Sequence, residues 1–190
     1  MSIGAGCKVL AWQVRISARQ EGPMTEEIRT AEGEVTGLRS VGITRVDGKT
    51  MLEHAGGPVK IRELSELFHT AVLEDDLLHD MFARGSRHHA VHLAHFLEEI
   101  MGGRQRYTDL HDGVAGLFEA HRDLRITEDQ RRRFVEIMIS VLDIVDFPRD
   151  SRLRAGFSAR LEQGSHFSKN LSQVGAEPLD PWPPVGTWDW

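Results

Sequence analysis

The stretch that decides the fold reads HAVHLAHFLEEIMGG over residues 89–103 and EAHRDLRIT over residues 119–127. The first part has apolar residues at helical spacing and ends at Gly102 and Gly103, where glycine readily supplies the left-handed backbone that terminates a helix. The second part brings His121 back just before another helix. This layout lets two imidazoles, from His89 and His121, face each other across a flat cofactor.

Two faces of the helix that ends at Gly102 carry different chemistry. His89, Leu93 and Phe96 share one face, because an α-helix has about 3.6 residues per turn, and one polar group on an apolar face suits a ligand pocket. A neighbouring face holds His88, His92 and His95 at i, i+4 and i+7. That triplet could chelate a divalent metal such as zinc, although histidines at a solvent-facing edge give the same spacing.

Helical periodicity also extends through most of the chain after residue 55. Apolar residues recur at three- and four-residue steps from Val59 to Phe82, which predicts a long helix and a short turn. Ser86 can cap the helix that follows. Thr127 and Gln130 have the form of a capping box that starts a strongly apolar helix. A last helix is expected over about residues 150–168, whereas residues 104–120 look short and irregular.

The two ends of the chain differ from this helical part. Residues 1–50 form a poorly defined N-terminal extension, with possible short strands at 8–16 and 41–46 and a turn at Asp47-Gly48. The globular domain is expected over residues 51–170. Residues 171–190 form a tail rich in proline and tryptophan, expected to be extended and exposed. Either end could mediate assembly.

Composition excludes several classes of partner. The 190-residue chain has a net charge of −6, so no nucleic-acid-binding surface is expected, and Arg131, Arg132 and Arg133 are interpreted as a solvated helix face. No apolar run approaches the ~20 residues of a membrane helix. The single cysteine, Cys7, and the absence of a signal-peptide pattern fit a reducing cytoplasm.

From residue 51 onward the chain resembles the truncated haemoglobins of bacteria, specifically their second group. Thirteen short elements follow one another at the spacing of that family. They are Met51–Gly57, Ile61–His69, Asp75–Phe82, His89-x-x-His92, Phe96-Leu97, Gly102-Gly103, Tyr107, His121, Ile126–Arg133, Gly164-Ser165, Asn170, Ser172-Gln173 and Gly175-Ala176.

The resemblance implies an all-α fold, the truncated globin, in which helices stack two over two around haem b. It makes His121 the proximal iron ligand, a neutral imidazole whose other ring nitrogen donates to a carbonyl or similar group. It further implies that Phe82 lies on the porphyrin and that Leu93 and Phe96 line the distal side. The other cofactor-binding residues that it implies are His89, Tyr107 and Phe134, with His92 and Arg125 reaching haem propionates.

Two positions depart from the family pattern. His69 stands where the family usually has a tyrosine that donates to bound oxygen, and Phe134 stands where it usually has a tryptophan. The distal ligand site would therefore comprise His69, His89 and Phe134. The two histidines could act as donors in place of the missing groups, or one of them could bind iron and make it six-coordinate.

The function implied is reversible binding of O2, NO or CO by a monomer or homodimer. A haem pocket equally supports NO dioxygenation, peroxidase-like chemistry or sensing, because a fold alone does not select among them. Such enzymatic roles would need an external reductase, since the chain has no glycine-rich dinucleotide motif. The missing tyrosine and tryptophan leave open a globin-like interaction or sensor domain that has lost haem.

Overall fold

The computed structural model describes residues 45–86 and 88–188, and all regular secondary structure within these ranges is helical. The predicted all-α class is therefore confirmed. The predicted turn at Asp47-Gly48 is present, closed by a bridge between Val46 and Lys49. The predicted strand at residues 8–16 and most of the one at 41–46 lie outside the described residues.

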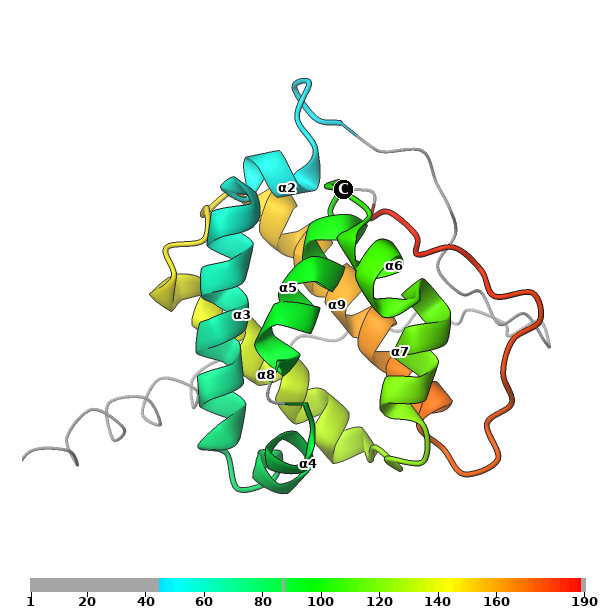
Figure 1. Cartoon of the computed structure of the whole chain (residues 1–190). Helices are drawn as coiled ribbons and strands as arrows, with labels where there is room; N and C mark the ends of the chain where they lie inside the picture. Colours follow the sequence, from blue (N-terminus) through cyan, green and yellow to red (C-terminus); the bar gives the residue numbers. More distant parts are fainter. Residues whose placement is uncertain (1–44, 87, 189–190) are drawn as a thin grey trace, which may run out of the picture. The chain divides into compact units, whose positions relative to one another are not determined.

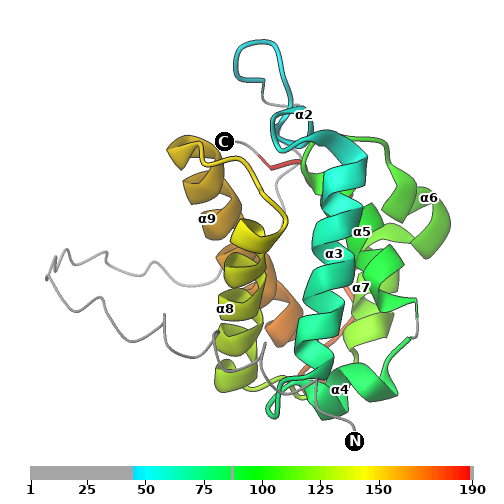
Figure 2. The same cartoon turned by 90° about the vertical axis from the view of Figure 1, so that its left-hand side faces the viewer.

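The helices pack as two pairs. In Figure 2, α3 and α5 lie on one side and α8 and α9 on the other, and α3 contacts both α5 and α8. Shorter helices join and cover these pairs (Figure 1). The elements are α2 (Met51–His54), α3 (Gly57–Leu73), α4 (His79–Arg84), α5 (His89–Ile100), α6 (Arg106–His111), α7 (Gly113–His121), α8 (Glu128–Ile144) and α9 (Ser151–Leu171).

Local signals place several helix ends as the sequence predicts. Thr127 and Gln130 form a complete capping box at the start of α8. Gly102 takes a φ of 90° just beyond α5, a left-handed conformation that favours glycine. Ser86 accepts a hydrogen bond from the backbone N–H of His88, but α5 itself begins at His89. The positions of these ends determine which residues of each helix face the core.

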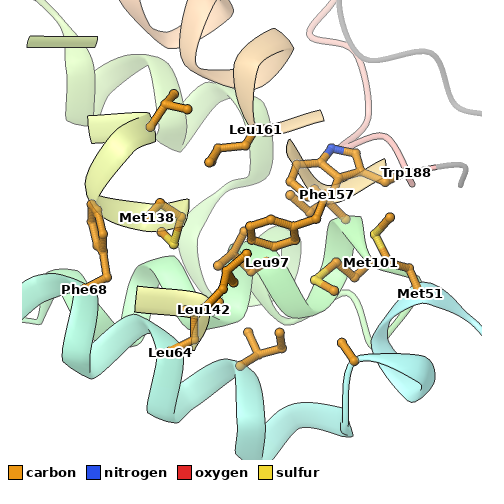
Figure 3. Close-up of a cluster of buried hydrophobic side chains, with 14 of the residues drawn as sticks. Met51, Leu64, Phe68, Leu97, Met101, Met138, Leu142, Phe157, Leu161 and Trp188 are labelled. Carbon is orange, nitrogen blue, oxygen red and sulfur yellow. The ribbon is translucent and has the colours of Figure 1, made fainter. Parts of the chain in front are cut away.

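The core fills the space between the two helix pairs. Figure 3 shows Leu64 and Phe68 of α3 and Leu97 of α5 with Met138 of α8 and Phe157 of α9. Full burial of each such side chain contributes about 1.5–3 kcal/mol. None of the helices in the described part of the chain is long and apolar enough to cross a membrane.

The segment expected to be irregular, residues 104–120, instead forms most of α6 and α7. Tyr107 of α6 and Leu117 and Phe118 of α7 are buried. The helices meet at Asp112 and Gly113, which both have φ near +57°: 58° and 56° respectively. This left-handed pair breaks the helical periodicity, so the apolar positions do not follow one repeat in the sequence. His121 consequently ends a helix.

The C-terminal segment is ordered against the helices over its described part. The Trp188 ring packs at 5.7 Å from Phe157, and its backbone N–H donates to the carbonyl of Ile100. Trp182 packs at 5.3 Å from Phe118 of α7. The expectation of an exposed tail is wrong for Val185 and Trp188, which are both buried. Aromatic burial explains why a proline-rich segment without regular structure stays on the domain.

The arginine cluster on α8 is also not a simple solvated face. Arg131 is only 6% exposed and pairs with Glu128 of its own helix and Glu162 of α9. Arg133 pairs with Asp75, which precedes α4, at 2.6 Å. Acidic partners from other parts of the fold allow these guanidiniums to lie inward, and such partners cannot be read from the local sequence.

A matched pair of glycine substitutions tests the close α6–α7 junction. A Cβ at Gly116 would overlap the backbone carbonyl of His111, so we expect Gly116→Ala to destabilise the protein by about 1–3 kcal/mol. A Cβ at Gly164 in α9 would meet nothing within 4 Å, so Gly164→Ala should stabilise by about 0.5–1 kcal/mol. Denaturant unfolding measures both, and equal effects would contradict the close approach.

Candidate functional site

His121, the last residue of α7, is held in one tautomer. Its Nδ1 lies 2.8 Å from the backbone carbonyl of Leu117, one turn earlier in the helix. Because a carbonyl only accepts hydrogen bonds, Nδ1 carries the proton and Nε2 of the neutral ring keeps its lone pair. Burial lowers the pKa of His121 below its ordinary value of 6.5, so the ring is neutral at pH 7. The geometry is that of an imidazole prepared to donate to a metal.

Three aromatic rings from different helices gather in a second part of the site. His69 of α3 and His89 of α5 stack with ring centroids 5.5 Å apart and planes 23° apart. Phe82 of α4 meets His89 edge-on at 4.8 Å and His69 at 6.4 Å. The three positions are far apart in the sequence, and the folding of α3, α4 and α5 together creates the cluster.

The charge state of His89 links this cluster to His121. The pKa of His89 is lowered to about 3, chiefly by burial and then by repulsion from the protonated forms of His69, His121 and His92, in that order. Because His121 is among these causes, the imidazole of α7 lies close enough to that of α5 to affect its pKa. Both rings are neutral at physiological pH, because burial disfavours the charged form of an imidazole.

Two ring nitrogens in this cluster have no hydrogen-bond partner. They are Nε2 of His69 and Nδ1 of His89, the only buried side-chain nitrogen or oxygen atoms without a partner among the residues that the structure describes. A buried polar atom left unpaired costs about 1–3 kcal/mol, so native structures keep few of them. Their location on facing rings indicates a place where a bound polar group is accommodated.

Apolar side chains complete the walls. Phe134 of α8 packs edge-on against Phe68 at 4.9 Å, and Phe68 in turn contacts Phe82 at 6.1 Å. Phe82, Leu93, Phe96 and Phe134 all pack on the core yet remain partly uncovered. Incompletely covered apolar side chains beside neutral imidazoles form a wall suited to a large, flat and mostly apolar ligand.

Other residues expected at the site lie at its margin. Tyr107 is buried against Phe96, with ring centroids 5.1 Å apart, and burial raises its pKa to about 12. His92 faces α6, where its ring lies 4.3 Å from that of His111. Arg125 is exposed in the loop after α7. Tyr107 therefore supports the wall through Phe96, while His92 and Arg125 are not part of the aromatic cluster.

The histidine triplet at the start of α5 and within it, His88, His92 and His95, does not form a metal site. His95 Nδ1 lies 3.0 Å from His111 Nε2, and the rings of His88 and His92 are 6.4 Å apart. Within the described ranges, no group of three or more histidine, cysteine, aspartate or glutamate side chains is arranged to hold a metal ion. The metal hypothesis for His88, His92 and His95 is therefore wrong. Helix spacing could not reveal His111, which α6 brings to this face.

Comparison with known protein families identifies the family to which the chain belongs. The family model described as bacterial-like globin matches residues 50–158. The chain belongs to the bacterial-like globins. No curated protein matches the chain.

Solved structures of truncated haemoglobins share the fold. The group II truncated haemoglobin from Bacillus anthracis superposes with a TM-score of 0.58 at 23% identity, covering 67% of this chain and 96% of that one. The thermostable haemoglobin from Thermobifida fusca gives 0.57 at 22% identity, covering 67% and 99%. The oxygen-avid truncated haemoglobin from Bacillus subtilis gives 0.57 at 23%, covering 64% and 100%. The predicted resemblance to truncated haemoglobins is confirmed.

Haem is the cofactor that membership of a globin family implies, and the residues present fit it. His121 offers an unprotonated nitrogen, apolar side chains offer flat surface, and two imidazoles offer unpaired nitrogens. Sequence reasoning did not identify the Leu117 carbonyl or the supporting ring of Phe68. Leu117 lies one turn before His121, a spacing from which the bond could have been expected.

The neutral histidines between α5 and α6 predict sensitivity to acid. Burial, the largest cause for each, lowers the pKa of His92, His95 and His111. The unfolded chain then takes up protons near pH 6.5 while the folded one does not. The free energy of unfolding should therefore be highest above pH 6.5 and fall below it, by at most about 1.4 kcal/mol per pH unit for each extra proton.

His111→Gln tests this sensitivity by removing one member of the group. We expect denaturant unfolding between about pH 7.5 and 5.5 to show a smaller loss of stability in this variant than in the wild type. His166→Gln, at an exposed position of α9, should keep the wild-type slope. An unchanged slope in His111→Gln would show that these imidazoles are not held neutral.

Proposed function

We propose that this protein is a haem b globin that reversibly binds O2, NO or CO at an iron held by His121. The observation that carries the proposal is the hydrogen bond from His121 Nδ1 to the Leu117 carbonyl, which leaves Nε2 unprotonated on a half-buried, neutral ring. The haem would supply a ferrous centre able to bind a diatomic gas. The protein's part is to hold the group, exclude water and stabilise the ligand.

The side chains that would hold the macrocycle come from four helices. Phe82, Leu93, Phe96 and Phe134 provide apolar contact, and Tyr107 supports Phe96 from behind. Exclusion of water by such residues slows the loss of bound gas and of electrons. His92 and Arg125, near the margin, are the groups that we assign to the propionates, where solvent screening keeps their contribution modest.

His69 and His89 would form the ligand-facing part of the pocket. Each neutral imidazole has one N–H to donate, and each has a buried nitrogen without a protein partner. A bound oxygen molecule that accepts from one of them would remove part of the penalty of these unpaired atoms. These two imidazoles replace the phenol and indole that related proteins use, with Phe134 adding only apolar surface.

Reversible ligand binding is the role that this pocket supports best. NO dioxygenation or peroxidase-like turnover would additionally require an electron donor, which we expect to be a separate cytoplasmic reductase. We infer that a monomer or homodimer suffices for gas binding, because every residue assigned to the pocket comes from one chain.

Removal of the His121 imidazole is the direct test of iron binding. Wild-type protein supplied with haem should show a sharp Soret band that shifts with CO, and His121→Ala should abolish or greatly weaken it, because the axial bond is lost. His166→Ala, on the exposed side of α9, should behave as wild type. Equal haem binding by wild type and His121→Ala would refute the proximal assignment.

The distal assignment is tested by His69→Phe, which keeps an aromatic ring but removes its donor. A hydrogen bond of about 1.4–3 kcal/mol corresponds to an O2 dissociation rate that rises about 10- to 100-fold. CO dissociation from the same variant is the control, because bound CO accepts hydrogen bonds weakly. Stopped-flow kinetics showing equal changes for O2 and CO would contradict a donor role for His69.

A further inference from the structure

The loop that follows His121, residues 122–127, holds two residues in a left-handed conformation. Asp123 has a φ of 58° and Arg125 a φ of 54°. This region is unfavourable for residues other than glycine, typically by about 1–2 kcal/mol each, and persists only where surrounding contacts impose it. The backbone directly beyond the proposed iron ligand is therefore held by other parts of the protein.

The contacts that hold this loop come from the end of α9. Ser172 is fully buried, and its backbone carbonyl accepts from the N–H of Arg125 at 2.8 Å. Its Oγ accepts from the N–H of Ile126 at 3.0 Å and donates to the carbonyl of Lys169 at 2.6 Å. The Gln173 side-chain amide donates to the carbonyl of Ile126 at 3.1 Å. We call this set of bonds from Ser172 and Gln173 the Ser172 clamp.

The preceding part of α7 is held by the C-terminal segment. Trp182 packs on Phe118, three residues before His121, and the Arg122 guanidinium lies 5.4 Å from the centre of the same Phe118 ring. Because His121 is bonded to the carbonyl of its own helix, its ring moves with α7. The direction of Nε2 thus depends on contacts made on either side of the residue along the chain.

We propose that Ser172 is a positioning residue for His121, which holds the loop at Asp123–Ile126 and so sets how the imidazole is presented to the haem iron. This rests on the proposed function, since it assumes that His121 binds iron. Ser172 lies beyond residues 50–158, the part that the family model matches. The bonds of the clamp to Arg125 and Ile126 therefore join the C-terminal part of the chain to the part that the family model matches.

The test is Ser172→Ala, which removes the hydroxyl and keeps the backbone carbonyl. We expect the iron–histidine stretching band in the resonance Raman spectrum of the ferrous protein to shift and broaden, because the loop is no longer fixed at Ile126. Ser168→Ala, one turn earlier on α9, is the matched control and should leave the band unchanged. An unchanged band in Ser172→Ala overturns the proposal.

Repeating the Ser172→Ala substitution in a His121→Gly variant separates positioning of the histidine from a general structural effect. In His121→Gly with added imidazole, the iron ligand is no longer attached to α7, so Ser172→Ala should not move the iron–imidazole band. A shift of the iron–imidazole band of equal size with free imidazole overturns the proposal, because the effect of Ser172 would then not depend on the covalent link between the ring and α7. Failure of wild-type protein to bind haem would instead refute the proposed function.

Gln173→Ala keeps the proposal testable if loss of the buried hydroxyl prevents folding. Gln173 is exposed and donates to the carbonyl of Ile126, whose N–H is bonded to the Ser172 hydroxyl, so this variant should fold. It is expected to move the band in the tethered protein only, by less than Ser172→Ala would. If the band of Gln173→Ala stays unchanged, the proposed role of the clamp is overturned.

Discussion

The hydrogen bond between His121 Nδ1 and the Leu117 carbonyl is the constraint on which the proposed iron site depends. It decides which ring nitrogen carries the proton, and therefore which nitrogen has a lone pair. Burial keeps the ring neutral by lowering its pKa. A histidine in the same place with the other tautomer would present an N–H where a metal needs a donor atom. The short helix α7 thus determines which nitrogen of His121 is unprotonated.

The packing of the helices leaves some side chains of the candidate site incompletely covered. Phe68 and Leu64 are fully buried in the core, whereas Phe82, Phe96 and Phe134 are only partly covered. Unpaired nitrogens on His69 and His89 add an energetic penalty at the same place. A ligand that covers these rings and pairs these nitrogens would raise the stability of the folded state, since binding to the native state alone stabilises it.

Much of the fold follows from local sequence, and most of the departures arise from distant contacts. Periodicity places the four long helices, the capping box starts α8, and Gly102 ends α5. The shared face of His89, Leu93 and Phe96 is also predictable from helix geometry. The left-handed junction at Asp112 and Gly113 hides α6 and α7, however. Tertiary partners decide the burial of Arg131 and of Trp188, and no local pattern encodes them.

The Ser172 clamp illustrates why the pocket cannot be understood from its lining residues alone. Ser172 and Ile126 are separated by 46 positions, and the bond between them forms only when α9 packs beside α7. A strained loop stays in a single conformation only while such bonds outweigh its strain. Trp182 also packs on Phe118 of α7. The C-terminal segment therefore contacts the chain both before His121, at Phe118, and after it, at Ile126. The orientation of the proposed iron ligand therefore depends on residues that touch neither the iron site nor the distal histidines.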